Sequence, residues 1–298
     1  MAMRVATFQT TSALMQKTMT TQARLAEVQA QQANGLKSSD YGGLGSSAGR
    51  VVDLSISVTR AEANISAANT VVSRNDMASS VLQDITDILT NARSAVSATR
   101  SDDELQSLQN NAAEYLEDLK TMLNTQYQGR YLFSGSTTDT APVDFTAYAV
   151  ADLTTVNTDY YQGDGYTQTI RLNNGQQMDY GITATVSGFE EALRALSYVA
   201  DGNLTDTSEL QDVDALLVSA QDSVIAATSK AGNTSSRLGS YIENEEDFIA
   251  EAENLAAGET SIDAAEATVL ATSYETQLEA SYSALSKILN LNLSDYLR

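Results

Sequence analysis

The sequence predicts a mainly α protein with a small β-rich insert, arranged as an elongated antiparallel rod of long helices with paired N- and C-terminal helices. Three observations support this fold class. The 298 residues include only 16 glycines, one proline and no tryptophan, a composition that favours long helices over a compact mixed domain. Apolar residues recur with heptad spacing over two long stretches. Residues typical of strands and turns are concentrated in the middle of the chain.

Charge and missing residue types exclude many functions. The chain has 39 acidic and 17 basic residues, a net charge of -22. This argues against nucleic-acid and anionic membrane partners, because both bind mainly through Lys and Arg. The chain has no Cys and no His, which excludes disulfides, thiolate or imidazole metal ligands and the Ser-His-Asp triad. We therefore predict no catalytic, cofactor or metal site.

Residues 1–45 are predicted to form an N-terminal assembly helix and turn. The helix, residues 7–34, is rich in Gln, Thr and Ala and has a thin apolar stripe. Burial of this small apolar surface barely offsets the conformational entropy lost when the helix forms, so we expect the helix to need a partner. An ordinary core helix is the alternative. The stripe contains Leu14, Thr18, Leu25 and Val28.

The glycine-rich turn at residues 37–45 does not indicate a phosphate loop, because no strand precedes it and no Gly-Lys-Ser/Thr ending follows. The first ten residues contain one arginine and no apolar run, so they do not indicate a cleavable secretory signal, and no segment approaches transmembrane length. By sequence alone, these features are typical of a cytoplasmic protein without membrane insertion.

Residues 46–128 are predicted to form the ascending part of the rod. A long helix to about Arg100 is interrupted in its apolar pattern at Asn75, and a capping box at Ser101 and Glu104 begins a shorter helix that ends near Tyr127. The heptad stripe of the long helix contains Leu54, Val58, Ala61, Ile65, Ala68, Val72, Leu82, Ile85, Leu89, Ala92 and Val96.

Residues 129–186 are predicted to form the β-rich insert. Residues 130–135 have the composition of a strand, and residues 167–172 and 176–180 flank an Asn-Asn-Gly turn, a strong hairpin signal. Because the insert joins two long helices, we expect it at the far end of the rod, where it should be dispensable for tube formation.

Two sets of side chains in the insert, five tyrosines and three aspartates, are candidates for a binding function. Exposed tyrosines would be able to stack on sugars or on a protein partner, but packing within the insert's own sheets is the favoured interpretation. The aspartates do not fit the spacing of a calcium loop, which favours a solvated acidic surface. The sets are Tyr148, Tyr160, Tyr161, Tyr166 and Tyr180, and Asp159, Asp164 and Asp179.

Residues 187–258 are predicted to form the returning part of the rod. A short helix over residues 189–200 precedes a second long helix with the strongest periodic pattern in the chain. The acidic run Glu243, Glu245, Glu246 and Asp247 is interpreted as a solvated helix face rather than a carboxylate pair for acid/base chemistry. The heptad positions are Leu210, Val213, Leu217, Ala220, Val224, Ala227, Ala231, Thr234, Leu238, Tyr241, Glu245, Phe248, Ala252 and Leu255.

Residues 259–298 are predicted to form the C-terminal assembly helix. After a break at Gly258, a capping box at Thr260 and Asp263 predicts a helix start near Ser261. Its stripe is too polar for a membrane span and too narrow for a globular core, so another helix should cover it. The stripe contains Leu270, Tyr274, Leu278, Ser281, Leu285 and Ile288, widened by Tyr282, Leu289 and Leu293.

Two long helices joined through the middle must return antiparallel, which brings the terminal segments to the same end as a paired stem. The predicted partner interface of this stem lies on both terminal helices. It comprises Leu14, Leu25, Val28, Leu270, Tyr274, Leu278, Tyr282, Leu285, Ile288, Leu289 and Leu293.

Several motifs resemble the flagellin superfamily, and most of all its hook-filament junction proteins. Residues 129–142 read Gly-Arg-Tyr-Leu-Phe-Ser-Gly-Ser-Thr-Thr-Asp-Thr-Ala-Pro and are similar to the start of the family's β domain; residues 161–164 (Tyr-Gln-Gly-Asp), the turn at residues 34–40 and the ending at residues 291–297 are also similar to the family's. The motif residues carried over are Ser39, Asp40, Gly129, Arg130, Tyr131, Phe133, Gly135, Thr138, Thr140 and Pro142.

The resemblance implies a structural subunit of the bacterial flagellum, exported unfolded through the type III apparatus to an extracellular site without a cleavable signal. It implies terminal segments that are disordered in the monomer and form coiled coils in a helical tube. The implied partners are other copies of the chain, neighbouring hook-associated protein and flagellin subunits, and an export chaperone. A filament-forming flagellin and a cell-surface glycan-binding adhesin are the alternatives.

Overall fold

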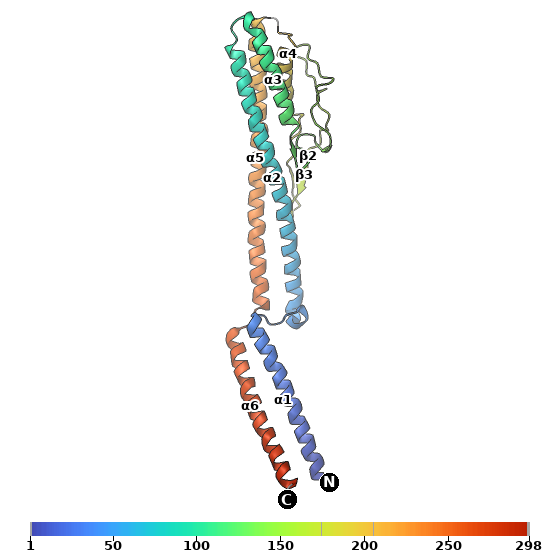
Figure 1. Ribbon diagram of the computed structural model, residues 1–298, viewed down its shortest axis with the longest axis vertical. Coiled ribbons are helices and arrows are strands. Elements are labelled where there is room, and N and C mark those ends of the chain that lie inside the picture. The colour runs from blue at the N-terminus through green and yellow to red at the C-terminus, as the bar shows by residue number, and fades with distance from the viewer. Residues whose placement is uncertain (1, 174, 205, 297–298) are drawn as a thin grey trace. The chain divides into compact units, whose positions relative to one another are not determined.

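The computed structural model describes residues 2–173, 175–204 and 206–296, with side chains described for residues 9–288 within these ranges (Figure 1). The chain divides into two compact units. Met1–Arg60 together with Phe248–Arg298 form the first, here called the terminal unit, and Ala61–Asp247 form the second, the central unit. Among the described residues, no helix combines the length and apolar character that crossing a membrane requires.

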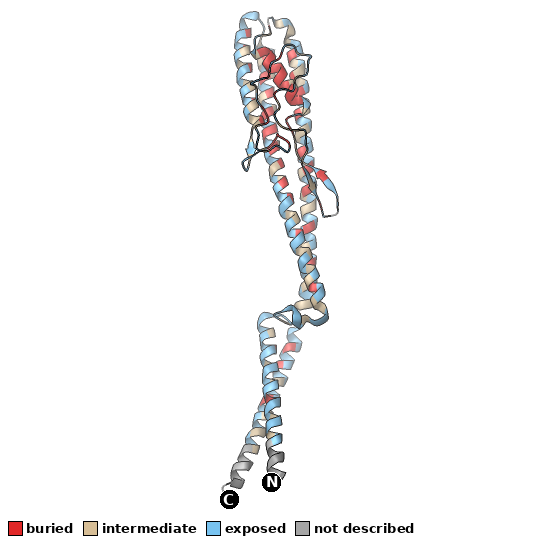
Figure 2. Ribbon diagram, turned by 90° about the vertical axis from the view of Figure 1, so that its right-hand side faces the viewer, coloured by how far each residue is buried: buried red, intermediate tan, exposed pale blue. Residues whose placement is uncertain are grey.

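The terminal unit is built mainly from two helices, α1 (Ala2–Asn34) and α6 (Ala264–Tyr296), which lie side by side (Figures 1 and 2). It also contains the 3₁₀ helix η1 (Tyr41–Ser47). The long helices α2 (Ala48–Ala98) and α5 (Leu210–Thr260) begin and end in this unit, respectively, and continue into the central unit. The predicted pairing of the terminal helices is confirmed.

In the central unit, α2 and α5 run antiparallel. Arg93 Nε lies 3.1 Å from Asp214 Oδ1, and farther along the pair Ser235 Oγ donates to Asp76 Oδ1 at 3.2 Å. The predicted seam of α2 is confirmed, except that Asn75 does not interrupt it. Its side chain is only 1% exposed, because it falls on the same seven-residue repeat as its apolar neighbours. The buried members of that repeat are Ala61, Ala68, Asn75, Leu82, Leu89 and Val96.

The predicted seam of α5 is confirmed from Val213 to Leu238 but is wrong at two later positions. Phe248 is 44% and Leu255 is 54% exposed. A straight α-helix drifts by about 20° per heptad relative to a strict seven-residue repeat, so one edge of the stripe turns away from its partner after several heptads. Ala252, on the other edge of the stripe, stays buried.

Two shorter helices, α3 (Leu105–Leu123) and α4 (Ser187–Ala200), complete a four-helix core with α2 and α5. The predicted capping box of Ser101 and Glu104 is present, on the 3₁₀ turn η2 (Asp102–Glu104) before α3. A further 3₁₀ turn, η3 (Thr207–Glu209), leads into α5. The largest fully buried side chains of this core include Leu82, Ile85, Leu89, Leu119, Leu123, Leu193, Leu196 and Leu217.

The insert is less regular than predicted. Its described strands form two antiparallel hairpins, β1 (Gln126–Tyr127) with β2 (Arg130–Tyr131), and β3 (Thr169–Arg171) with β4 (Gln177–Asp179). The strand expected over residues 130–135 is therefore only two residues long. The second hairpin is confirmed, although Asn174 of its predicted turn lies outside the described residues.

The insert is not confined to the far end of the helix pair, where we expected it. Ile170 and Met178 are register partners in the second hairpin, so they lie on one face of it. Met178 and Leu172 are buried against Ala68 of α2 and Leu238 of α5. The insert thus folds back along the helix pair, because its apolar face needs a surface to cover it.

A buried ion pair fixes the other part of the insert to α4. Glu190 and Arg194 are each 5% exposed, and Arg194 Nη2 donates to Glu190 Oε2 at 3.0 Å. The backbone N–H of Asn157 donates to Glu190 Oε1 at 3.0 Å, and Arg194 Nη1 donates to the carbonyl oxygen of Leu153. Each charge therefore also bonds the insert backbone, as a buried ion pair requires to offset its desolvation.

The predicted break before the C-terminal helix is displaced by a few residues. Helix α5 continues through Gly258 to Thr260, and α6 begins at Ala264. Asp263 caps α6, since its Oδ1 accepts from the backbone N–H of Ala265 at 2.8 Å. Thr260 Oγ1 instead donates back to the carbonyl oxygen of Ala256 at 2.9 Å, which makes Thr260 the end of one helix rather than the start of the next.

Candidate functional site

Helices α1 and α6 meet along a narrow seam. Gln32 Nε2 donates to Thr268 Oγ1 at 3.3 Å near the start of α6, and Val28 is buried with Ala267 and Ala271. Leu25 and Tyr274 pack against the same cluster. Residues earlier in α1 therefore contact residues later in α6, so the two helices are antiparallel. The seam follows heptad spacing on both helices, and its buried residues include the small or polar Thr18, Ala267 and Ala271 beside Val28 and Leu278.

The predicted interface residues fall into three groups by exposure, apart from two whose side chains are not described. Val28 and Leu278 are buried in the seam, at 7% exposure each, whereas Leu270 and Tyr282 are 38% and 50% exposed. The side chains of Leu289 and Leu293 lie outside the described residues. The half-buried members are Leu14, Leu25, Tyr274, Leu285 and Ile288.

Sequence reasoning placed the start of the α6 seam on the wrong residue. Ala267 and Ala271, 5% and 8% exposed, precede Tyr274 and Leu278 with the spacing that a heptad seam requires. The larger Leu270 lies off this seam. Alanine carries a weak apolar signal, and only its spacing relative to Tyr274 could have revealed its role.

Large apolar residues remain uncovered around the pair. Met15 and Met19 of α1 are 50% and 59% exposed, and Val269 of α6 is 69% exposed. Met15 and Met19 are four residues apart and therefore share one face of the helix. With Leu270 and Tyr282, they give each terminal helix apolar surface that the other helix does not cover. Where such residues form a large contiguous patch, the patch is a candidate surface for protein interaction.

A short clasp joins the turn after α1 to the turn between α5 and α6. The backbone N–H of Lys37 donates to the carbonyl oxygen of Thr260 at 2.7 Å, and the N–H of Ile262 donates to that of Gly35 at 3.0 Å. Lys37 Nζ adds a bond to the carbonyl oxygen of Glu259 at 2.8 Å. The two chain breaks that lead into the terminal helices are thus bonded to each other.

Glu259 extends the clasp to the start of α2. Its carboxylate accepts from Ser47 Oγ at 2.5 Å and pairs with Arg50 Nη2 at 2.8 Å. Of the two motif residues in this turn, Asp40 caps η1 by accepting from the N–H of Gly43 at 2.9 Å. Ser39 is exposed.

The first motif residues of the insert form a tight hairpin. Gln128 and Gly129 have φ of 52° and 76°, and positive φ at both central residues is what a two-residue type I′ hairpin turn requires. Arg130 and Tyr131 then form β2. Arg74 Nη2 of α2 donates to the carbonyl oxygens of Tyr131 and Leu132, both at 3.1 Å, so the hairpin is bonded to α2.

Phe133 and Pro142 are the buried aromatic ring and the buried proline of the longest motif. Phe133 is 0% exposed, and its ring lies 6.1 Å from that of Phe189 in an edge-to-face arrangement. Pro142 is buried and accepts from the N–H of Gln162 at 2.9 Å. Between them, the carbonyl oxygen of Thr138 accepts from the N–H of Tyr131 at 2.9 Å, and the N–H of Thr140 donates to Thr137 at 3.0 Å.

The motif at residues 161–164 meets the longer motif at Gly135. The backbone N–H of Ser136 donates to Asp164 Oδ1 at 2.8 Å, and its hydroxyl donates to Oδ2. The hydrogen bond from the Ser136 hydroxyl has the larger effect and the one from its backbone N–H the smaller, and both lower the pKa of Asp164. Gly135 has φ of 73°, and a Cβ atom there would lie 2.1 Å from Asp164 Oδ1. The two motifs are therefore hydrogen-bonded to each other, and this contact joins two parts of the insert that are far apart in the sequence.

The tyrosines of the insert mainly support its own packing. Tyr148 and Tyr160 are buried with ring centroids 5.6 Å apart at 87°, and burial raises the pKa of both. Tyr160 OH donates to the carbonyl oxygen of Ala184 at 2.9 Å. Tyr161 and Tyr180 are half-buried, and Tyr166 is 55% exposed. Packing within the insert is thereby confirmed for Tyr148 and Tyr160.

The acidic residues singled out in the sequence do not form a site. Asp159 and Asp179 are exposed, and the described residues contain no group of three or more His, Cys, Asp or Glu side chains that could hold a metal. In the acidic run of α5, Glu245 is not on a solvated face as predicted. Its side chain is 8% exposed and lies in the seam. Oε1 accepts from Asn173 Nδ2 at 3.3 Å, and Oε2 has no hydrogen-bond partner among the described residues.

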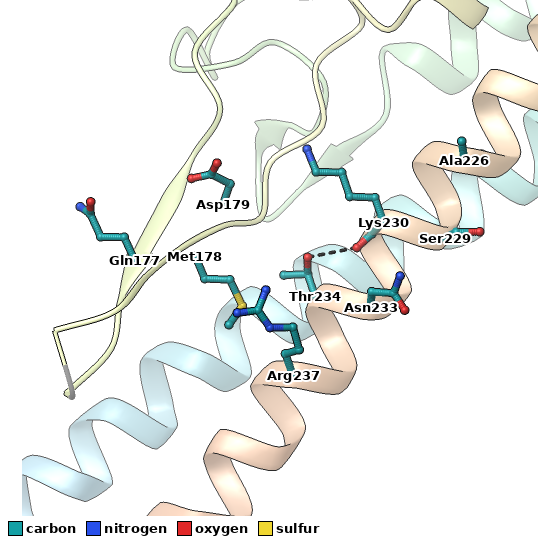
Figure 3. A pocket seen from close by; sticks show the side chains of 9 residues that line it. All are labelled: Gln177, Met178, Asp179, Ala226, Ser229, Lys230, Asn233, Thr234 and Arg237. Carbon is teal, nitrogen blue, oxygen red and sulfur yellow. Dashed lines mark hydrogen bonds between the residues drawn. The ribbon is translucent and has the colours of Figure 1, made fainter.

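A cavity of about 750 Å³ lies between β4 and α5 (Figure 3). Lys230 and Arg237 project into it from α5, and β4 forms the opposite wall. Both cations are exposed. The remaining lining residues are Gln177, Met178, Asp179, Ala226, Ser229, Asn233 and Thr234.

Comparisons with known proteins agree with this architecture. Residues 5–138 match the family model of the bacterial flagellin N-terminal helical region. FlgL from Bacillus cereus is similar in structure, with a TM-score of 0.51 and 17% identity over 69% of this chain and 96% of that one. A putative flagellar hook-associated protein from Vibrio parahaemolyticus has a TM-score of 0.47 and 16% identity over 75% and 96%. No curated protein sequence matches.

Proposed function

We propose that this chain, whose fold is flagellin-like and whose residues 5–138 match the flagellin N-terminal helical region, is a structural subunit of the bacterial flagellum. In this role it joins the hook to the filament and assembles into a helical tube through α1 and α6. The observation that carries the proposal is the apolar surface that these two helices leave uncovered, including Met15, Met19 and Val269.

The energetics of the seam favour association between copies. Full burial of a large apolar side chain contributes about 1.5–3 kcal/mol, but Ala267 and Ala271 have little apolar area to bury. The intramolecular seam is therefore weak, and neighbouring copies that cover the exposed methionines, Val269 and Leu270 add what it lacks. Head-to-tail contacts that do not close into a ring generate a helical assembly.

The junction role is supported by the motifs at residues 129–142 and 161–164, which resemble those of hook-filament junction proteins, and by the likeness of the fold to FlgL. The proposed partners are further copies, neighbouring hook-associated protein and flagellin subunits, and an export chaperone. The proposed site is the extracellular flagellum, reached by type III export without signal cleavage, and the role is structural rather than catalytic. A filament-forming flagellin has the same architecture and is the alternative.

The assembly mechanism is tested by placing a charge on the exposed face of α6. Val269→Asp should abolish assembly, followed by light scattering and electron microscopy, because the charge would be buried between copies. Ser219→Asp is the control, since Ser219 is exposed on α5 in the central unit, away from the terminal helices, and the variant adds the same negative charge. Normal assembly of the Val269→Asp variant would contradict the proposal.

The position in the flagellum is tested by electron microscopy of a strain that lacks the gene. Hooks without filaments are expected for a junction subunit. Normal filaments on the hooks, in a strain without a second copy of the gene, would contradict both the junction role and the flagellin alternative.

A further inference from the structure

We infer that the cavity between β4 and α5 binds the acidic face of α5 on a second copy of this chain, which gives the assembly a second, electrostatic contact in the central unit. This inference rests on the proposed self-assembly. It adds a contact that depends on charge and is separate in the sequence from the apolar surface of α1 and α6.

The cavity presents an array of cationic and polar donors. Lys230 and Arg237 are seven residues apart on α5, so they lie on one face of the helix about 10 Å apart along its axis. Asn233 lies between them, and Gln177 extends from the wall that β4 forms (Figure 3). These side chains can bond two carboxylates at once.

The charge of this cavity is opposite to that of the chain. The chain carries a net charge of -22, yet the cavity is lined by two cations and one carboxylate, Asp179. The ion pairs among the described residues involve Arg50, Arg93, Lys120 and Arg194, and neither Lys230 nor Arg237. Both cations therefore remain available to a partner.

The complementary surface lies farther along the same helix. Glu243, Glu246 and Asp247 are exposed, and residues three and four apart share one helix face. These carboxylates form no ion pair within the described part of the chain. Asp247 follows Arg237 by ten residues and Glu243 follows Lys230 by thirteen. A parallel neighbour shifted lengthwise by about 15–20 Å therefore sets carboxylates opposite both cations.

Zero-length carbodiimide cross-linking tests the contact directly. Lys230 cannot reach Glu243 within one chain, because thirteen helical residues span about 20 Å. We expect mass spectrometry of the assembling full-length chain to find Lys230 joined to Glu243, Glu246 or Asp247. The internal control is Lys120, whose Nζ lies 3.7 Å from Glu117 Oε2 and which should cross-link within its own chain.

Charge exchange tests whether the contact contributes to assembly. The double variant Lys230→Glu/Arg237→Glu should raise the concentration required for half-assembly at low salt by about tenfold or more, since two attractive pairs become repulsive. Adding Glu243→Lys/Asp247→Lys should restore assembly. Arg60→Glu/Arg100→Glu alters the net charge equally at two other exposed positions and should have little effect.

The outcomes separate this inference from the proposed function. Assembly without the Lys230 cross-links, or equal loss in the Arg60/Arg100 control, would overturn the inference and leave the proposed function intact. Cross-linked pairs from a chain that never forms tubes would contradict the proposed function and support the contact. A chain that neither assembles nor cross-links between copies would contradict both.

Discussion

The terminal and central units use the same heptad spacing but bury very different side chains. The buried residues of the α1–α6 seam include Thr18, Ala267 and Ala271 beside Val28 and Leu278, whereas the core of the central unit contains many fully buried large residues, among them Leu82, Leu89 and Leu217. Of the described large hydrophobic residues that are exposed, ten belong to the terminal unit and four to the central unit. Spacing therefore determines where helices meet, and side-chain size determines how strongly they hold.

The number of covering elements widens this difference. In the central unit, α3, α4 and the insert cover α2 and α5, so leucines of both long helices are fully buried. In the terminal unit, α1 and α6 cover each other along their seam, and Met15 and Val269 remain exposed. We therefore expect the central unit to be stable in a single copy and the terminal pair to depend on neighbours.

The largest expected effect is that of removing the insert. Replacing residues 143–182 by a short linker deletes Val143, Tyr148 and Tyr160 from the core and uncovers Phe133. Each buried large side chain contributes about 1.5–3 kcal/mol. We therefore expect the free energy of unfolding, measured by thermal denaturation, to fall by more than about 4 kcal/mol. A melting temperature within a few degrees of the parent's would contradict this contribution of the insert to the stability of the central unit.

A matched pair of leucines compares the two units. Leu217→Ala should lower the free energy of global unfolding by about 2–5 kcal/mol, as for a leucine in a close-packed core. Leu278→Ala should change it by less than about 1 kcal/mol, because the α1–α6 pair opens locally before the central unit unfolds. Equal shifts in urea unfolding would contradict the difference between the units. Asp222→Ala, at an exposed position of α5, should change little.

Gly135 tests the closure of the insert. Gly135→Ala should destabilise the central unit by about 1–3 kcal/mol, since it adds overpacking at a residue with positive φ and places a methyl group against Asp164. Gly165→Ala is the control, because a Cβ atom there meets nothing within 4 Å. Differential scanning calorimetry of the two variants should separate them, and equal melting temperatures would refute the steric explanation.

The smallest expected difference concerns two buried hydroxyls in the central unit. Tyr160→Phe removes the hydrogen bond to Ala184 and should cost about 1 kcal/mol. Tyr148→Phe removes a buried hydroxyl that has no hydrogen-bond partner among the described residues and should be neutral or slightly stabilising. Chemical unfolding of both variants measures the difference, and a larger loss for Tyr148→Phe would show that its hydroxyl has a partner in solution.

The sequence predicted the helices and most of their seams because heptad spacing is a local signal. Leu14, Leu25 and Val28 of α1 and Leu82 to Val96 of α2 lie where that spacing placed them. The Asn-Gly turn likewise predicted the second hairpin. Gly258 misled because a single glycine is tolerated inside a long helix, and Asp263 proved the stronger cap.

The remaining features depend on contacts between distant residues. Docking of Leu172 and Met178 on Leu238 and the meeting of Gly135 with Asp164 involve residues far apart in the chain. Neither spacing nor composition carries that information. The cavity of Lys230 and Arg237 arises only because β4 folds over α5, so it was not predictable from the sequence.

Amide hydrogen exchange of the monomeric chain tests most directly the claim that the terminal helices depend on neighbours. At a concentration below assembly, amides of α1 and of α6 after Ala264 should exchange close to the rate of an unprotected chain, while those of α2 from Leu82 to Val96 exchange only through global unfolding. Assembly should then protect the terminal helices. Equal protection of α6 and α2 in the monomer would show an intramolecular core and contradict the account.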